Sequence, residues 1–119
     1  MEDETLRITM LMDFFGDLLT EKQREYLDLY RNDDLSLSEI AEKKGITKQG
    51  VHDIITRAEK RLDAIEKKTG VVQRWLDAKA ELLLAETMAR ELLQSQRLDT
   101  KSAESAQKLV LALGRLKDQ

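Results

Sequence analysis

The segment Leu35–Leu62 constrains the fold of this chain more than any other part of the sequence. Ser36 is followed three residues later by Glu39, which is the spacing of a capping box, in which each side chain bonds the backbone amide of the other residue. Gly45 can adopt the positive φ of a helix C-cap, and Thr47 can cap a further helix directly after it. The sequence therefore predicts two helices joined by a tight turn, one ending just before Gly45 and one beginning just after Thr47.

Apolar residues in this segment predict how the two helices pack. Ala41 lies where the helices must cross closely, because a methyl group fits there and a longer side chain would force them apart. The second helix carries one apolar stripe at the three-to-four spacing of a buried face, formed by Val51, Ile54 or Ile55, Ala58 and Leu62. This pattern predicts a helix-turn-helix, in which a supporting helix holds a recognition helix. A capped three-helix core without any ligand is the alternative interpretation.

The polar side of the predicted recognition helix carries the candidate nucleic-acid contacts. Gln49 can pair with adenine through two hydrogen bonds, Lys48 can donate to guanine, and the helix N-terminus favours phosphate. Gly50 either admits a closely approaching backbone or ligand or is an ordinary surface glycine. We expect a nucleic-acid-binding site at Lys43, Lys44, Thr47, Lys48, Gln49, His52, Thr56 and Arg57, with Asp53 on the same face and Lys60 and Arg61 as further phosphate contacts.

Composition places the chain in the all-α class. The 119 residues include no proline, and helix-favouring residues dominate without the alternating patterns of strands. The sequence has no cysteine and one histidine, which excludes disulfides and thiolate metal sites, so we expect neither a metal nor a cofactor. The acidic N-terminus and the short apolar runs, the longest being the five residues 109–113, predict a cytoplasmic protein without membrane insertion.

Charge and motifs restrict the class of function further. Residues 1–35 carry 4 basic and 10 acidic groups, residues 36–69 carry 8 and 6, and residues 70–119 carry 8 and 7. This balance predicts weak or dimer-dependent DNA binding, and the acidic first third would instead suit a basic protein partner. We do not expect an enzyme, because the sequence has no phosphate-binding glycine loop and His52 has no carboxylate at triad spacing.

Two regions carry more apolar surface than one small domain can bury. The first runs from Thr5 to about Leu19, and the second follows Gly70 as two helical patterns separated near Leu98, the later one capped by Asp99 or Thr100. The expected stripes are Trp75, Ala78, Leu82, Ala85, Ala89 and Leu92, and then Ala103, Ala106, Leu109 or Val110, Leu113 and Leu116. We therefore expect a helix-turn-helix domain at 1–70 and a helical hairpin at 71–119. A homodimer through the N-terminal and C-terminal helices would place two recognition helices about 34 Å apart.

Residues 19–62 resemble the YlxM family of small bacterial helix-turn-helix proteins, which is similar to the region 4 domain of sigma-70 factors. The resemblance covers roughly Thr5–Trp75 and is most specific at Asp33–Glu42 and Gln49–Asp53. It implies a cytoplasmic, non-enzymatic regulatory protein that is linked, largely by gene neighbourhood, with the signal recognition particle. By similarity to sigma region 4, the base readers would be Lys48, Gln49 and His52, with Arg57 nearer the backbone, while Asp53 departs from the basic residue expected there. An adaptor that contacts a protein of the particle through the same motif is the alternative function.

Overall fold

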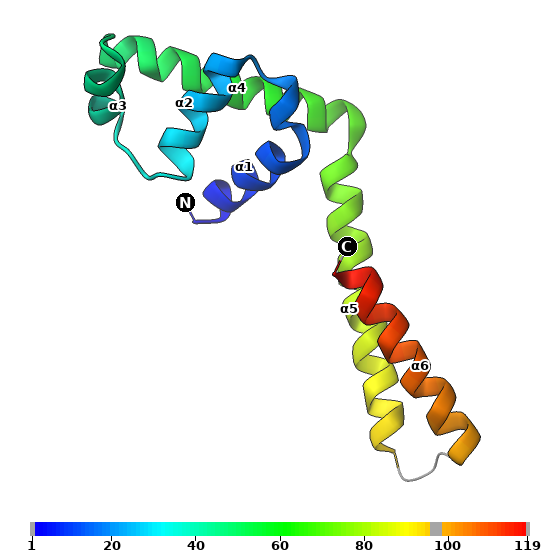
Figure 1. Ribbon diagram of the computed structural model, residues 1–119. Coiled ribbons are helices and arrows are strands. Elements are labelled where there is room, and N and C mark those ends of the chain that lie inside the picture. The colour runs from blue at the N-terminus through cyan, green and yellow to red at the C-terminus, as the bar shows by residue number, and fades with distance from the viewer. Residues whose placement is uncertain (1, 96–98, 119) are drawn as a thin grey trace. The chain divides into compact units, whose positions relative to one another are not determined.

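The computed structural model describes residues 2–95 and 99–118, and every regular element in these residues is a helix, which confirms the expected all-α class. In chain order the elements are α1 (Glu2–Phe15), the 3₁₀ turn η1 (Gly16–Leu18), α2 (Glu21–Arg31), α3 (Leu37–Lys44), α4 (Lys48–Thr69), α5 (Val71–Gln94) and α6 (Thr100–Lys117) (Figure 1). They form two compact units, residues 1–72 and residues 73–119. The assignment of residues 1–70 as the helix-turn-helix domain and of residues 71–119 as the packing or dimerisation hairpin stays a prediction.

The first unit is built around α4. Helices α1, α2 and α3 all contact it, and α3 lies beside its first turns (Figure 1). The most completely buried side chains come from all four helices and from the same apolar stripes: Ile8, Leu11, Leu27, Ile40, Val51 and Leu62. Burying one such aliphatic side chain stabilises the fold by roughly 1.5–3 kcal/mol before the loss of chain entropy is counted. This core fixes the rotation of α4 about its own axis.

The beginning of the chain is less regular than its apolar pattern suggests. The expected helix from Thr5 to about Leu19 ends as an α-helix at Phe15, where the backbone leaves helical geometry, and a 3₁₀ turn follows. The Leu19 amide closes this turn by donating to the Gly16 carbonyl at 3.1 Å. The tighter turn lets both Phe15 and Leu19 reach the core, where they are 7% and 8% exposed.

The connection between α2 and α3 is held by local polar chemistry. Thr20 and Gln23 form a capping box at the start of α2. The helix ends before the polar residues 32–34, and Asp34 adopts a φ of 59°, a left-handed conformation that Asp tolerates better than most residues. The Leu35 amide then donates to the Leu29 carbonyl at 3.1 Å, which closes the turn before the Ser36 cap of α3.

The second unit is a hairpin in which α6 lies beside the later part of α5 (Figure 1). Its small core consists of Ala89, Val110 and Leu113, with Leu82, Ala85 and Leu93 packed against it. This core confirms the predicted seam at Leu82, Ala85, Ala89 and Leu113, and Val110 takes the position for which Leu109 was the other candidate. Leu92, also predicted on the seam, is 52% exposed, and Leu93 packs there. Two further predictions were wrong, because Ala78 is exposed and Leu116 is 50% exposed.

Polar groups also link the two helices of the hairpin. Asp99, the first of the two predicted caps, accepts a hydrogen bond from the Ser102 amide at 2.7 Å and begins α6. Glu86 of α5 is 6% exposed and lies 2.9 Å from Arg90 Nη2 and 3.0 Å from Lys117 Nζ of α6. The hydrogen bonds from Lys117 and then Arg90 lower the pKa of the Glu86 carboxyl below its ordinary value. The carboxylate therefore joins α5 to the last turn of α6.

Candidate nucleic-acid interface

The turn between α3 and α4 is fixed by caps on both sides. The Glu39 amide donates to Ser36 Oγ at 3.0 Å and the Ser36 amide donates to Glu39 Oε1 at 3.1 Å, which confirms the predicted capping box. Gly45 has a φ of 68°, where a side chain would be strained, and ends α3 as predicted. The Ile46 amide then donates to the Ala41 carbonyl at 3.2 Å. These bonds determine where α4 begins relative to α3.

The start of α4 is capped from outside its first turn. The Thr47 hydroxyl accepts from the Gly50 amide at 3.0 Å, as predicted. A Cβ added at Gly50 would lie 3.1 Å from that same Thr47 Oγ1, so within the fold the atom that approaches this glycine most closely is the oxygen of the cap. The first turn contains no acidic residue, so the positive end of the helix dipole is not offset by a carboxylate there.

The apolar stripe of α4 faces the core, so the polar side of the helix faces outward. Val51, Ala58 and Leu62 are fully buried, and Ile55, at 5% exposed, takes the stripe position for which Ile54 was the other candidate. On the outward side Lys48, Gln49, His52, Asp53 and Arg57 are exposed, and Thr56 is half-buried. The structure therefore places these predicted residues on one side of one helix, beside its N-terminus.

Lys43 and Lys44 of α3 were predicted to belong to this surface, and they differ in exposure and in charge pairing. Lys43 is exposed. Lys44 is only 23% exposed, pairs with Glu25 of α2, and lies 5.7 Å from the centroid of the Tyr26 ring. Its charge is already balanced within the fold, so Lys43 is the better placed of the two for an outside anion.

Three of the four acidic residues of α4 are engaged by the fold, which the sequence alone did not predict. Glu59 pairs with Arg31 at 2.7 Å, Asp63 pairs with Arg7 at 2.6 Å, and Glu66 accepts from the Val72 amide at 2.9 Å, so all three are engaged by the fold. The six basic residues of the helix are all exposed: Lys48, Arg57, Lys60, Arg61, Lys67 and Lys68. The spacing of the three acids, next to the apolar stripe, was the available signal.

The outward surface is thus more basic than the composition of the helix suggests. A helix of 22 residues is about 33 Å long, and its basic side chains extend from the first turn to the last. Arg61 also donates from Nε to the Leu18 carbonyl at 3.0 Å, which anchors that side chain near the end of η1. Exposed cations along one face, with a capped N-terminus at one end, are typical of a surface that binds phosphates.

Comparison with known proteins identifies the family. A family profile described as "Putative helix-turn-helix protein, YlxM / p13 like" matches residues 2–106. The chain belongs to this family. The match confirms the predicted resemblance and extends it past Trp75, through α5 and into α6. In DNA-binding proteins with a helix-turn-helix, the second helix of the motif lies in the major groove.

Curated relatives carry the same family name. A UPF0122 protein of Acetivibrio thermocellus is 47% identical over 81 residues, which are 68% of this chain and 69% of that protein. A second, from Thermoanaerobacter sp., is 49% identical over 74 residues, or 62% of this chain and 63% of the relative, so that match spans less than two thirds of either protein. A third, from Halalkalibacterium halodurans, is 45% identical over 83 residues, which are 70% of this chain and 75% of the relative.

The described residues offer neither a metal site nor a membrane span. Among residues 2–95 and 99–118, no group of three or more His, Asp or Glu side chains is arranged to hold a metal ion. No helix in those ranges is long and apolar enough to cross a bilayer. His52 is exposed on α4, with its Nδ1 3.7 Å from Asp53 Oδ1. The exposed polar surface of α4 is therefore the strongest candidate for a functional site.

Proposed function

We propose that this protein is a helix-turn-helix regulator that binds duplex DNA through the outward face of α4 and acts in the protein-targeting pathway of the signal recognition particle. The observation that carries the DNA-binding part is that the fold engages three of the four acids of α4, while its six basic side chains stay exposed. The proposed contacts are Lys43, Lys44, Thr47, Lys48, Gln49, His52, Thr56 and Arg57. The link to the particle rests on the resemblance to the YlxM family alone.

The first turns of α4 would lie in the major groove, with Lys48, Gln49 and His52 at base edges. Arg57, Lys60 and Lys67 would lie further along the helix and contact phosphates. This division predicts different phenotypes for the two groups, because base contacts set sequence preference and phosphate contacts set overall affinity.

A pair of variants tests this division. Lys48→Ala combined with Gln49→Ala should abolish the preference for a selected duplex over a scrambled one, while Lys67→Ala should weaken binding to both duplexes equally. Circular dichroism checks that each variant is folded, and fluorescence anisotropy measures both affinities. Unchanged preference in the double variant would show that α4 does not read bases.

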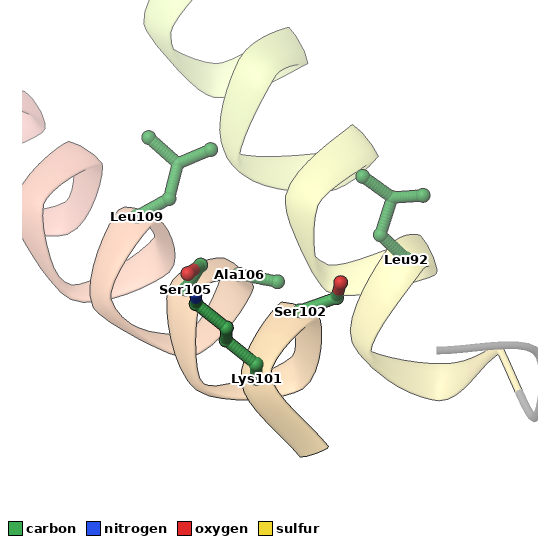
Figure 2. A pocket seen from close by; sticks show the side chains of 6 residues that line it. All are labelled: Leu92, Lys101, Ser102, Ser105, Ala106 and Leu109. Carbon is green, nitrogen blue, oxygen red and sulfur yellow. The ribbon is translucent and has the colours of Figure 1, made fainter. Parts of the chain in front are cut away.

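We further propose that two copies of the chain act together through the exposed apolar side chains of the N-terminal and C-terminal helices. Leu84, Met88 and Leu92 follow one side of α5 at a spacing of four residues and are 61%, 56% and 52% exposed. Leu92 also lines a groove of about 410 Å³ with Ala106 and Leu109 of α6 (Figure 2). A two-helix hairpin has too little core to hide these groups, and a second hairpin would cover them.

An adaptor that binds a protein of the particle is the second candidate. It is favoured by the excess of acidic over basic groups in residues 1–35, which carry 10 and 4, with Glu21 and Asp28 of α2 among the exposed ones. Such a surface repels phosphates and attracts a basic protein. Binding to the particle's protein subunit without binding to DNA or RNA would favour this candidate.

A further inference from the structure

Three side chains meet on the outward face of α4. Gln49 Nε2 donates to Asp53 Oδ1 at 3.0 Å, and His52 Nδ1 lies 3.7 Å from the same oxygen. The side chains of His52 and Asp53 are 56% and 57% exposed, so the cluster is open to a ligand. Asp53 therefore contacts two of the residues that are proposed to read bases.

An exposed carboxylate at Asp53 lowers the affinity of this surface for a nucleic acid. The other three acids of α4, Glu59, Asp63 and Glu66, are engaged by the fold, whereas Asp53 is exposed beside the basic residues. A carboxylate at this place repels the phosphates that the lysines and arginines would attract. Its contribution must come from another interaction, and the hydrogen bond from Gln49 supplies one.

We infer that Asp53 is a positioning residue that orients the Gln49 amide for the recognition of adenine in duplex DNA. A carboxylate only accepts hydrogen bonds, so it fixes the nitrogen end of the amide toward itself. The bond uses one of the two amide hydrogens and leaves the other hydrogen and the carbonyl oxygen. These are the donor and the acceptor that pair with N7 and the amino group of adenine in the major groove.

This arrangement sets affinity and sequence preference in opposite directions. The charge of Asp53 weakens binding to every duplex, while its hydrogen bond restricts the orientations of Gln49 before DNA arrives, which reduces the ordering that binding must impose. The pairing requires DNA, because the major groove of A-form RNA is too deep and narrow for a side chain to read. The inference rests on the proposed function and adds a residue that determines specificity.

The chain contains a matched control for this pair. In α5, Gln73 Nε2 donates to Asp77 Oδ1 at 3.0 Å, with the same spacing of four residues. Asp77→Ala removes the same charge and the same kind of bond as Asp53→Ala, outside the helix-turn-helix. Asp53→Asn removes the charge and keeps an oxygen that can accept from Gln49.

The experiment selects a preferred duplex with the full-length wild-type protein from a randomised pool and then measures affinities for that duplex and a scrambled one. Asp53→Ala should bind the scrambled duplex more tightly and should reduce the preferred-to-scrambled ratio by roughly fivefold or more. Asp53→Asn should bind both duplexes more tightly and reduce the ratio less than Asp53→Ala does, because Asn can still accept from Gln49 but can also donate to it. Asp77→Ala should keep the wild-type ratio. Circular dichroism confirms that each variant is folded.

The outcomes separate the inference from the function on which it rests. If the wild-type protein prefers a duplex and Asp53→Ala keeps that preference within about twofold, Asp53 does not position Gln49 and only the inference is overturned. If the wild-type protein binds RNA or protein alone, or prefers no duplex, the proposed reading of bases fails and the inference fails with it.

Discussion

At the scale of single residues, small side chains and caps determine where the recognition surface lies. Ala41 is 9% exposed between α3 and α4, and its carbonyl accepts the hydrogen bond from Ile46 that closes the turn. Thr47 caps α4, and the absence of a side chain at Gly50 leaves room for the Thr47 hydroxyl. None of these three residues would contact a base, yet each fixes the position of residues that could.

Replacing Ala41 tests this role. Ala41→Leu should overpack the contact between α3 and α4 and lower the free energy of unfolding by about 1–3 kcal/mol. Ala64→Leu is the matched control, because Ala64 is exposed on α4 and the same enlargement there meets solvent. Urea denaturation followed by circular dichroism measures both changes. Equal stability of Ala41→Leu and the wild type would show that the two helices do not pack closely at this residue.

At the scale of helices, the sequence predicts the first unit better than the second. The caps at Thr20, Ser36 and Thr47 and the ends at Gly45 and Gly70 are all present, because each depends on residues close together in the chain. Ala78 and Leu92 were wrongly assigned to the hairpin seam because α5 has apolar residues on more than one side, so periodicity alone cannot select the buried one. The pairing of Glu59 and Asp63 with arginines of α2 and α1 depends on tertiary contacts and was missed for that reason.

The Glu86 ion pairs predict how the hairpin responds to acid. Because the folded state lowers the pKa of Glu86 from its ordinary value of 4.5, this group stabilises the fold above about pH 4.5 and loses that contribution as the pH falls through the lowered pKa. Glu86→Gln should therefore lower the Tm at neutral pH, where Lys117 and Arg90 lose their partner. The difference from the wild type should shrink as the pH falls below about 4.5.

Fluorescence of Trp75, the single tryptophan, follows unfolding of the full-length protein at each pH. Glu104→Gln is the control, because Glu104 is exposed on α6 and its replacement should leave the pH dependence of the Tm close to that of the wild type. A Tm difference between Glu86→Gln and the wild type that stays constant from neutral pH to below pH 4 would contradict the account.

At the scale of the whole molecule, the distribution of charge and apolar surface fits a protein that binds in pairs. The net charge is −3, and the basic side chains of α4 offer a limited number of phosphate contacts in one copy. Two copies double those contacts on one duplex, and the exposed apolar side chains of α5 and α6 offer a surface on which two copies can meet.

A charge placed on this apolar surface tests the proposed dimer. Met88→Glu should raise the dissociation constant of the dimer by about tenfold or more, because a carboxylate would be buried between the two copies. Leu111→Glu is the control, since Leu111 is 57% exposed and lies two residues from Leu109, on the opposite side of α6. Sedimentation velocity over a range of protein concentrations measures both. A wild-type protein that stays monomeric at high concentration would contradict the proposal.

If the basic residues of α4 bind nucleic acid, binding by the wild-type protein must depend on salt. Fluorescence anisotropy would compare random duplex DNA, the RNA of the signal recognition particle and the particle's protein subunit at about 50 mM and about 200 mM salt. We expect binding to duplex DNA that weakens by roughly tenfold or more across this range. Binding to the protein subunit alone, with an affinity insensitive to salt, would contradict it.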